Sequence, residues 1–156
     1  MVCNAPGETR DKARATVYLG GAIVGVTPEE ARGWRQEAAS ILNMAGFEVL
    51  DPTEGKDLEH PALYSAEEIV ETDLSMVEKA DILLVEVKRR DIPYIGTAME
   101  VRHAWQNGKT IMVWGCREPG YWLQYHATYM FGELNEAIAF ILNTFGPFGA
   151  YCPFIE

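Results

Sequence analysis

The strongest constraint on the fold is an uninterrupted apolar run near the middle of the chain, Ile82–Val85. A strand of this kind is buried on both faces, as the central strands of parallel sheets are. Segments with apolar residues at helical spacing stand on either side of it, at 66–80 and 97–107. A strand between two helices predicts a parallel sheet with right-handed crossovers and helices on both faces.

The same alternation of strand and helix extends along most of the chain. We predict strands at 15–20, 47–50, 82–87, 110–114 and 129–131, and helices at 28–45, 66–80, 97–107 and 133–145. Thr27-Pro28-x-Glu30 and Ser65-x-x-Glu68 are helix starts of the capping-box type. The predicted fold is an α/β three-layer domain, flavodoxin-like or Rossmann-like, with a parallel five-stranded sheet. It spans residues 15–156, after a flexible N-terminal extension over residues 1–14.

Composition excludes several classes of protein. The 13 Lys and Arg against 23 Asp and Glu give a net charge of −10, which argues against a nucleic acid polymer as partner. No apolar run approaches the ~20 residues of a membrane-spanning helix, so we expect no membrane partner. The three cysteines form no CxxC pair, which disfavours a disulfide framework or a zinc ribbon and favours a reducing, cytoplasmic compartment.

Ligands of such folds bind beyond the carboxyl ends of the strands. That rule selects Gly20-Gly21, residues 51–64, residues 88–96 and the segment from Gly115 onward. The Gly20-Gly21 pair lacks the spacing of a dinucleotide or phosphate-binding loop, so we expect no cofactor. The two glycines either permit a tight turn or let a flat ligand approach the backbone.

Three side chains are candidates for chemistry, and each has a plainer interpretation. Tyr18 is either a core residue or a hydroxyl that binds a carboxylate. Asp73 is either on a solvated helix face or a partly buried acid. Glu100 either closes a capping box with Thr97 in the first turn of a helix or is a permanently ionised carboxylate suited to nucleophilic attack.

Other polar residues are weaker candidates. Glu100-x-x-His103 has the spacing of a metal-ligand pair, but no second such pair exists in the sequence, so we expect no metal. Asp51 and Asp91 follow predicted strands, where an acid is either a turn residue or a ligand contact. Gly20, Gly21, Asp51, Asp91 and Gly96 are the predicted substrate-binding residues.

Several short motifs occur in a recognisable order. They are Val17–Gly21, Gly33–Arg35, Glu48–Pro52, Glu71–Leu74, Ala80–Val85 and Ile95–Glu100 with Ala104. Together, over roughly residues 16–142, they make the chain resemble the nucleoside 2-deoxyribosyltransferase family. The resemblance implies a Rossmann-like domain that transfers 2-deoxyribose between nucleobases by a ping-pong reaction.

The resemblance also implies a role for each candidate. Glu100 corresponds to the nucleophile that attacks the anomeric carbon, Tyr18 to the hydroxyl that orients it, and Asp73 to the acid/base that handles the proton of the base. Asp91 is the candidate for a loop acid that holds the base. Such a pair of acids is the arrangement of retaining glycosidases, and a raised pKa would help Asp73 to act as the acid.

The implied partners are purine or pyrimidine deoxynucleosides and free nucleobases. Because family members complete their sites across subunit contacts, we expect a homo-oligomer. Water must be excluded from a glycosyl-enzyme, and the aromatic segments Tyr121–Tyr129 and Phe145–Phe154 are candidates to close the site.

Two alternatives remain. One is a deoxynucleoside 5′-monophosphate N-glycosidase, a hydrolase on the same fold whose members bind the phosphate with Ser and Arg after the first strand. Ala22–Gly25 stands there and favours nucleosides, which leaves Arg35 or Arg102 as the candidate phosphate ligand. The other is a non-catalytic nucleoside- or nucleotide-binding domain, in which Glu100 serves only as a helix cap.

Overall fold

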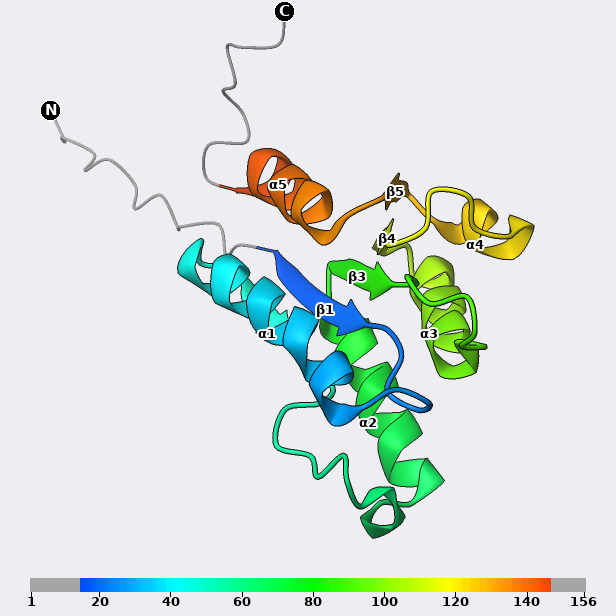
Figure 1. Cartoon of the computed structure of the whole chain (residues 1–156). Coiled ribbons are helices and arrows are strands. Elements are labelled where there is room, and N and C mark those ends of the chain that lie inside the picture. Colours follow the sequence, from blue (N-terminus) through cyan, green and yellow to red (C-terminus); the bar gives the residue numbers. More distant parts are fainter. Residues whose placement is uncertain (1–14, 147–156) are drawn as a thin grey trace, which may run out of the picture.

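The computed structural model describes residues 15–146, which form a sheet of five parallel strands (Figure 1). The strands are β1 (Thr16–Gly20), β2 (Glu48–Leu50), β3 (Ile82–Glu86), β4 (Thr110–Trp114) and β5 (Tyr129–Phe131). Their order in the sheet is β2-β1-β3-β4-β5, with all neighbours parallel. The apolar run that predicted a central strand is β3, which is buried along its whole length.

Helices cover both faces of the sheet and confirm the predicted three-layer fold. They are α1 (Pro28–Met44), α2 (Ala66–Lys79), α3 (Ile95–Gln106), α4 (Tyr121–His126) and α5 (Leu134–Phe145), with a short 3₁₀ helix, η1 (Pro61–Leu63). Figure 1 shows α1 and α5 on one side of the sheet and α2 and α3 on the other. In this arrangement all five strands end at the same edge.

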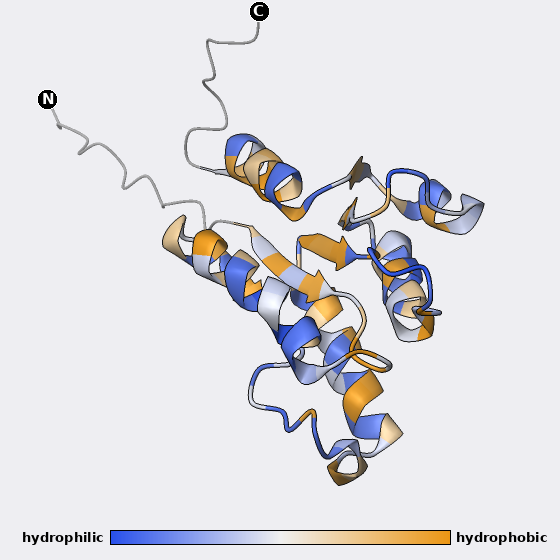
Figure 2. Ribbon diagram, in the orientation of Figure 1, coloured by the Kyte–Doolittle hydropathy of each residue, from blue (hydrophilic) through white to orange (hydrophobic). Residues whose placement is uncertain are grey.

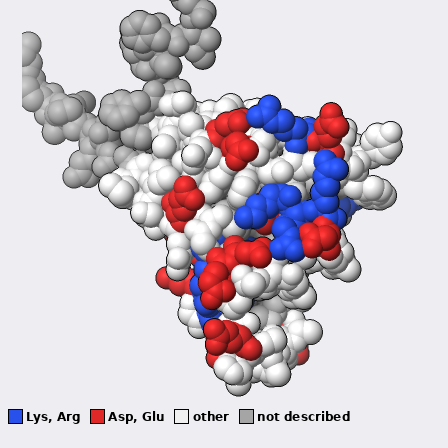
Figure 3. Space-filling model, in the orientation of Figure 1, with Lys and Arg blue, Asp and Glu red and all other residues white. Residues whose placement is uncertain are grey.

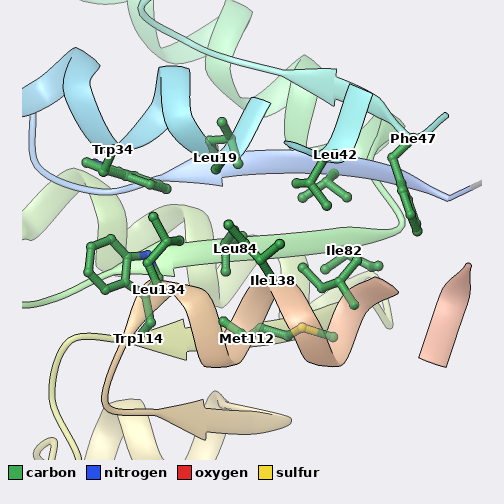
Figure 4. Close-up of a cluster of buried hydrophobic side chains, with 14 residues drawn as sticks. Leu19, Trp34, Leu42, Phe47, Ile82, Leu84, Met112, Trp114, Leu134 and Ile138 are labelled. Atoms are coloured by element: carbon green, nitrogen blue, oxygen red, sulfur yellow. The ribbon is translucent and has the colours of Figure 1, made fainter. Parts of the chain in front are cut away.

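Two clusters of buried side chains form the core, one on each face. Between the sheet and α1 and α5, Leu84 and Met112 pack with Leu42 and Ile138 (Figure 4). The second cluster lies under α2 and α3 and contains Tyr18. Figure 2 shows apolar residues along the strands and polar residues on the outward faces of the helices. Because successive side chains of a strand point to opposite faces, Tyr18 points toward α2 and α3, whereas Val17 and Leu19 point toward α1 and α5.

The first two helices begin where the sequence predicts. The side chain of Thr27 accepts a hydrogen bond from the backbone amide of Glu30, and Ser65 and Glu68 form a reciprocal capping box. Glu30 does not return the bond to Thr27, because its carboxylate pairs with Arg89 at 2.8 Å. One predicted capping box is thus complete. At the other, the Thr27 half forms, and the Glu30 side chain instead binds Arg89 of the segment between β3 and α3.

The capping box predicted for Thr97 and Glu100 at the start of α3 is wrong. This helix begins at Ile95 after Tyr94, and the backbone amide of Ala98 donates to the carbonyl of Tyr94 at 2.8 Å. Thr97 is therefore inside the helix and buried, so it does not cap Glu100. The predicted loop after β4 also contains α4, whose six residues are too few to show a helical period.

Some predictions fall on other parts of the chain. The N-terminal extension over residues 1–14 and the tail from residue 147 lie outside the described residues, and most of the aromatic segment Phe145–Phe154 with them. Within residues 15–146, no helix is long and apolar enough to cross a membrane.

Candidate active site

The carboxylate of Glu100 lies beside the carboxyl end of β1. Its Oε2 would be only 3.5 Å from a side-chain carbon added at Gly20, so the carboxylate lies close to the end of this strand. The hydroxyl of Tyr18, two residues earlier on the same strand, donates a hydrogen bond to Glu100. Tyr18 is fully buried, and burial together with the charge of Glu100 raises the pKa of its hydroxyl. Tyr18 is therefore both a core residue and a protonated donor to the carboxylate.

The pKa of Glu100 is raised to about 7, mainly by burial and further by the nearby charge of Asp73. The Tyr18 hydrogen bond and the cations Arg35 and Lys56 oppose this rise. The prediction of a permanently ionised carboxylate is thus wrong. Glu100 is the sixth residue of α3, beyond the first turn in which a helix terminus favours negative charge, and desolvation dominates.

Asp73 is buried on α2 and not on the solvated face of the helix. Its Oδ1 lies 3.2 Å from Nζ of Lys56, which comes from the loop after β2. Burial raises the pKa of Asp73, and Lys56 opposes the rise. The structure therefore brings Tyr18, Asp73 and Glu100 together, with both acids shifted toward the protonated form.

A cleft of about 1260 Å³ gives access to both carboxyl groups. It is lined by residues of α2, the β3–α3 loop, α3, the segment after β4 and α4, including Asp73, Gly96 and Glu100. Apolar and aromatic side chains form part of its wall, among them Leu74 and Trp122. A concave, mainly apolar site with a few convergent polar groups is the usual form of a small-molecule site.

The remaining predicted site residues lie elsewhere in the described structure. Asp51 accepts hydrogen bonds from the backbone amide and hydroxyl of Thr53 at 2.8 and 2.7 Å, the geometry of a turn residue. Asp91 is exposed and pairs with Arg89 at 2.6 Å. Gly21 packs against the core, since an added side-chain carbon would lie 3.0 Å from Cβ of Glu86. None of the three is among the residues that line this cleft, and neither is Gly20, although Gly20 lies close to the Glu100 carboxylate.

Arg35 is unsuited to hold a phosphate. Its guanidinium is fully buried and donates to the carbonyls of Leu19, Gly21 and Ala31 at 3.2, 3.1 and 2.6 Å. Its Nε also lies 3.9 Å from Asp51. Arg102, the other phosphate candidate, does line the cleft, where it contacts Nε2 of His126 at 3.1 Å.

The pair Glu100 and His103 does not form a metal site in the described structure. Nε2 of His103 instead lies 3.0 Å from Oε1 of Glu78. Within residues 15–146, no group of three or more His, Cys, Asp or Glu side chains is arranged to hold a metal ion.

Sequence reasoning missed two groups of residues near the site. Lys56 stands in a polar loop, and its approach to Asp73 depends on tertiary structure alone. Glu86 and Tyr94 are joined by a hydrogen bond of 2.6 Å beside the cleft. The sequence offered one hint of the second group. Glu86 directly follows the apolar run Ile82–Val85, and the end of such a strand is buried.

Several solved structures resemble this chain in fold. The chain is similar in structure to a 2-deoxyribosyltransferase from Bacillus psychrosaccharolyticus, with 21% identity, 80% of this chain and 90% of that chain covered, and a TM-score of 0.62. For a 2-desoxiribosyltransferase from Leishmania mexicana the values are 18%, 81%, 96% and 0.63. For a CMP N-glycosidase from Clostridium botulinum they are 17%, 80%, 95% and 0.57.

These similarities establish the fold, and the sequence itself establishes the family. No curated protein matches the chain. The family model for nucleoside 2-deoxyribosyltransferase matches residues 17–130, a stretch that contains Tyr18, Asp73 and Glu100. The chain therefore belongs to the nucleoside 2-deoxyribosyltransferase family.

Proposed function

We propose that this protein transfers 2-deoxyribose between nucleobases by double displacement through a glycosyl-enzyme on Glu100. One observation carries the proposal. The Glu100 carboxylate lines the cleft next to Gly20, accepts a hydrogen bond from Tyr18, and is near enough to Asp73 for the two charges to interact. A nucleophilic carboxylate with a second acid is what the cleavage of a glycosidic bond with retention requires.

In the first half-reaction, an oxygen of Glu100 forms a bond to the anomeric carbon as the bond from that carbon to the base nitrogen breaks. Asp73 in its protonated form donates its proton to the departing base, which leaves neutral. The hydroxyl of Tyr18 holds the attacking carboxylate in orientation. Gly20 and Gly96 let the sugar approach the backbone closely.

In the second half-reaction, a nitrogen of the incoming base attacks the same carbon. The bond to Glu100 breaks and regenerates the carboxylate, while the proton of the incoming base passes to Asp73. The enzyme returns to its starting state with one proton on Asp73. Two inversions at the anomeric carbon give net retention.

Burial raises the pKa of both acids, and the proposed cycle uses the form of the pair in which the shared proton is on Asp73. The reactive form of the free enzyme carries one proton on the Glu100–Asp73 pair, with Glu100 ionised and Asp73 protonated. Since the two carboxyl groups interact, they titrate as a pair with macroscopic pKa values. A pKa of about 7 for Glu100 places one of these near neutral pH.

We also propose that the protein is a homo-oligomer in which a second copy covers the cleft. Large apolar side chains next to the site are exposed: Val70, Ile95, Met99, Trp105, Tyr121, Trp122 and Tyr125. Trp122 is 82% exposed although it lines the cleft. An apolar patch of this kind typically marks an interface, and covering it would keep water from the glycosyl-enzyme.

A second candidate function is the hydrolysis of deoxynucleoside 5′-monophosphates, in which water replaces the incoming base. The observation that favours it is the charge at the cleft, which Arg89, Arg90 and Arg102 line although the chain is acidic overall. Figure 3 shows basic side chains gathered over the β3–α3 loop. Arg89 is already paired with Glu30 and Asp91, which reduces its attraction for a phosphate.

A chromatographic assay tests the proposal. The protein is incubated with deoxyinosine, with and without free adenine. New deoxyadenosine that forms only with adenine supports transfer, and Glu100→Ala should abolish it. Free hypoxanthine without a new nucleoside, or cleavage of deoxyinosine 5′-monophosphate alone, would support the hydrolase. A Glu100→Ala variant with wild-type turnover would exclude Glu100 as the nucleophile.

A further inference from the structure

Glu86 is a buried carboxylate that the proposed reaction does not use. It is the last residue of β3 and only 3% exposed. It lies beneath the turn after β1, because an added side-chain carbon at Gly21 would be 3.0 Å from its Cβ. A buried charge costs free energy unless it is paired or hydrogen-bonded, so its partners should reveal its role.

The partners of Glu86 all belong to the β3–α3 loop. Its Oε2 accepts a hydrogen bond from the hydroxyl of Tyr94 at 2.6 Å and one from the backbone amide of Lys88 at 3.3 Å. The oxygen of Tyr94 in turn accepts from the backbone amide of Arg89 at 3.0 Å. One carboxylate and one phenol therefore hold two successive amides and tie the start of the loop to its end.

Tyr94 also determines where α3 begins. Its backbone has φ 51° and ψ 36°, the left-handed conformation, and within residues 15–146 no other non-glycine residue has a positive φ. Such a conformation persists in a bulky residue only where the surroundings impose it. The bond from the Tyr94 hydroxyl to Glu86 supplies that restraint. Glu100 follows six residues later on the same helix.

An opposite charge organises the neighbouring loop. Arg35, fully buried, binds carbonyls of the β1–α1 segment at Leu19 and Gly21. The charge of Glu86 stabilises the charged form of Arg35. The β3–α3 loop also contacts the first turn of α1, where Arg89 binds Glu30 at 2.8 Å. Each loop is thus held by one buried charged side chain, Glu86 or Arg35, and the two opposite charges attract each other.

We propose that Glu86, acting through the hydroxyl of Tyr94, is a positioning residue for Glu100. The Glu86–Tyr94 bond fixes the left-handed turn from which α3 starts, and so fixes the direction in which Glu100 meets the anomeric carbon. The inference rests on the proposed function, because it assigns the pair an effect on that reaction. Neither residue donates or accepts a proton in the cycle.

The test is a double-mutant cycle with Tyr94→Phe and Glu86→Ala, measured as transfer from deoxyinosine to adenine. Tyr94→Phe keeps the ring and removes both hydrogen bonds of the hydroxyl, the one to Glu86 and the one from the amide of Arg89. We expect it to lower kcat at least about tenfold while KM changes less than threefold, because orientation and not binding is lost. The double variant should lose no more than the worse single variant, since both act through one bond. Glu86→Gln, which keeps an acceptor oxygen, should lose less than Glu86→Ala.

Tyr129→Phe is the control. Tyr129 lies on β5 and is not among the residues that line the cleft. Removal of its hydroxyl should change kcat less than twofold. Unchanged kcat in Tyr94→Phe, or additive losses in the double variant, would overturn the inference.

Amide hydrogen exchange separates this inference from the proposed function. Tyr94→Phe should speed exchange in residues 88–100 and leave β1 and α5 unchanged. If the wild-type protein transfers no deoxyribose yet shows this local effect, the proposed function fails and the structural link from Glu86 to α3 stands. If transfer occurs but exchange in residues 88–100 does not change, the positioning role is wrong and the proposed function stands.

Discussion

Nζ of Lys56 lies 3.2 Å from Oδ1 of Asp73, and both side chains are largely buried. The loop that carries Lys56 is attached to α1, because the guanidinium of Arg32 donates to the carbonyl of Lys56. The cation lowers the pKa of Asp73 directly and that of Glu100 at longer range. Lys56 therefore limits how far burial can shift both acids toward the protonated form.

The first prediction concerns this cation. Lys56→Met should raise the pKa of both Asp73 and Glu100, so both limbs of the kcat/KM profile against pH should move to higher pH. A shift of roughly one pH unit is the expected size for a close charge. Lys109→Met is the control, since Lys109 binds the carbonyl of Glu78 away from the cleft. A profile that stays in place would show that Lys56 does not influence the reacting acids.

The second prediction links activity to stability at Glu100. Glu100→Gln should lower transfer by a factor of roughly 10³ or more. It should also raise the Tm at pH 8 by about 3–8 °C, because the buried carboxylate is ionised there and opposes folding. The pKa of about 7 lies above the unfolded value, so this gain should grow from about pH 4.5 to pH 7 and then level off. Calorimetry at several pH values measures it, with the exposed Glu71→Gln as control.

The third prediction concerns Tyr18. Tyr18→Phe should lower kcat about tenfold to a hundredfold, the usual effect of one hydrogen bond to a charged group. Because that bond lowers the pKa of Glu100, its loss should move the acid limb of the profile to higher pH. Binding of deoxyinosine, measured by calorimetry, should persist. Kinetics identical to wild type would make Tyr18 a core residue alone.

The fourth prediction tests the space beside Glu100. Gly20→Ala places a methyl group 3.5 Å from Oε2 of Glu100 and from the ring of Tyr18, an ordinary contact that the fold tolerates. The sugar loses that space, so KM should rise at least about tenfold with little change in Tm. Gly33→Ala on α1 is the control, since nothing lies within 4 Å of its added carbon. Its Tm should rise slightly and its kinetics should not change.

The fifth prediction concerns the exposed aromatic side chains of α4. Trp122→Glu should dissociate the proposed oligomer, because it places a charge in an apolar interface. Sedimentation measures the assembly, and the ratio of hydrolysis to transfer should rise as water reaches the site. Tyr129→Glu, at an exposed aromatic residue of β5, serves as control. A wild-type protein that sediments as a monomer would contradict the oligomer.

Much of the fold follows from local sequence. The apolar run of β3 identifies a central parallel strand, and the caps at Thr27 and Ser65 locate two helix starts, because these features depend on neighbours within a few residues. Tyr18, Asp73 and Glu100 were also identifiable, through the order of short motifs along the chain. Their convergence also required α2 and α3 to pack against the face of the sheet that carries Tyr18.

What the local pattern could not determine was the environment of each group. Thr97 and Glu100 have the spacing of a capping box, but Tyr94 adopts a left-handed turn that starts α3 earlier and buries Thr97. The pKa of Glu100 likewise depends on residues distant in sequence, since desolvation and the charge of Asp73 outweigh any helix terminus.

The sequence by itself therefore determined the layers of this protein and the order of its elements, and it indicated three of the side chains that meet at the candidate site, Tyr18, Asp73 and Glu100. Only the tertiary structure decided how those residues are ionised and held. Lys56 reaches Asp73 across 17 positions and Arg89 reaches Glu30 across 59, and no local periodicity encodes such contacts. Burial and charge are properties of the packed chain, so the pKa of Glu100 is set by the fold around it.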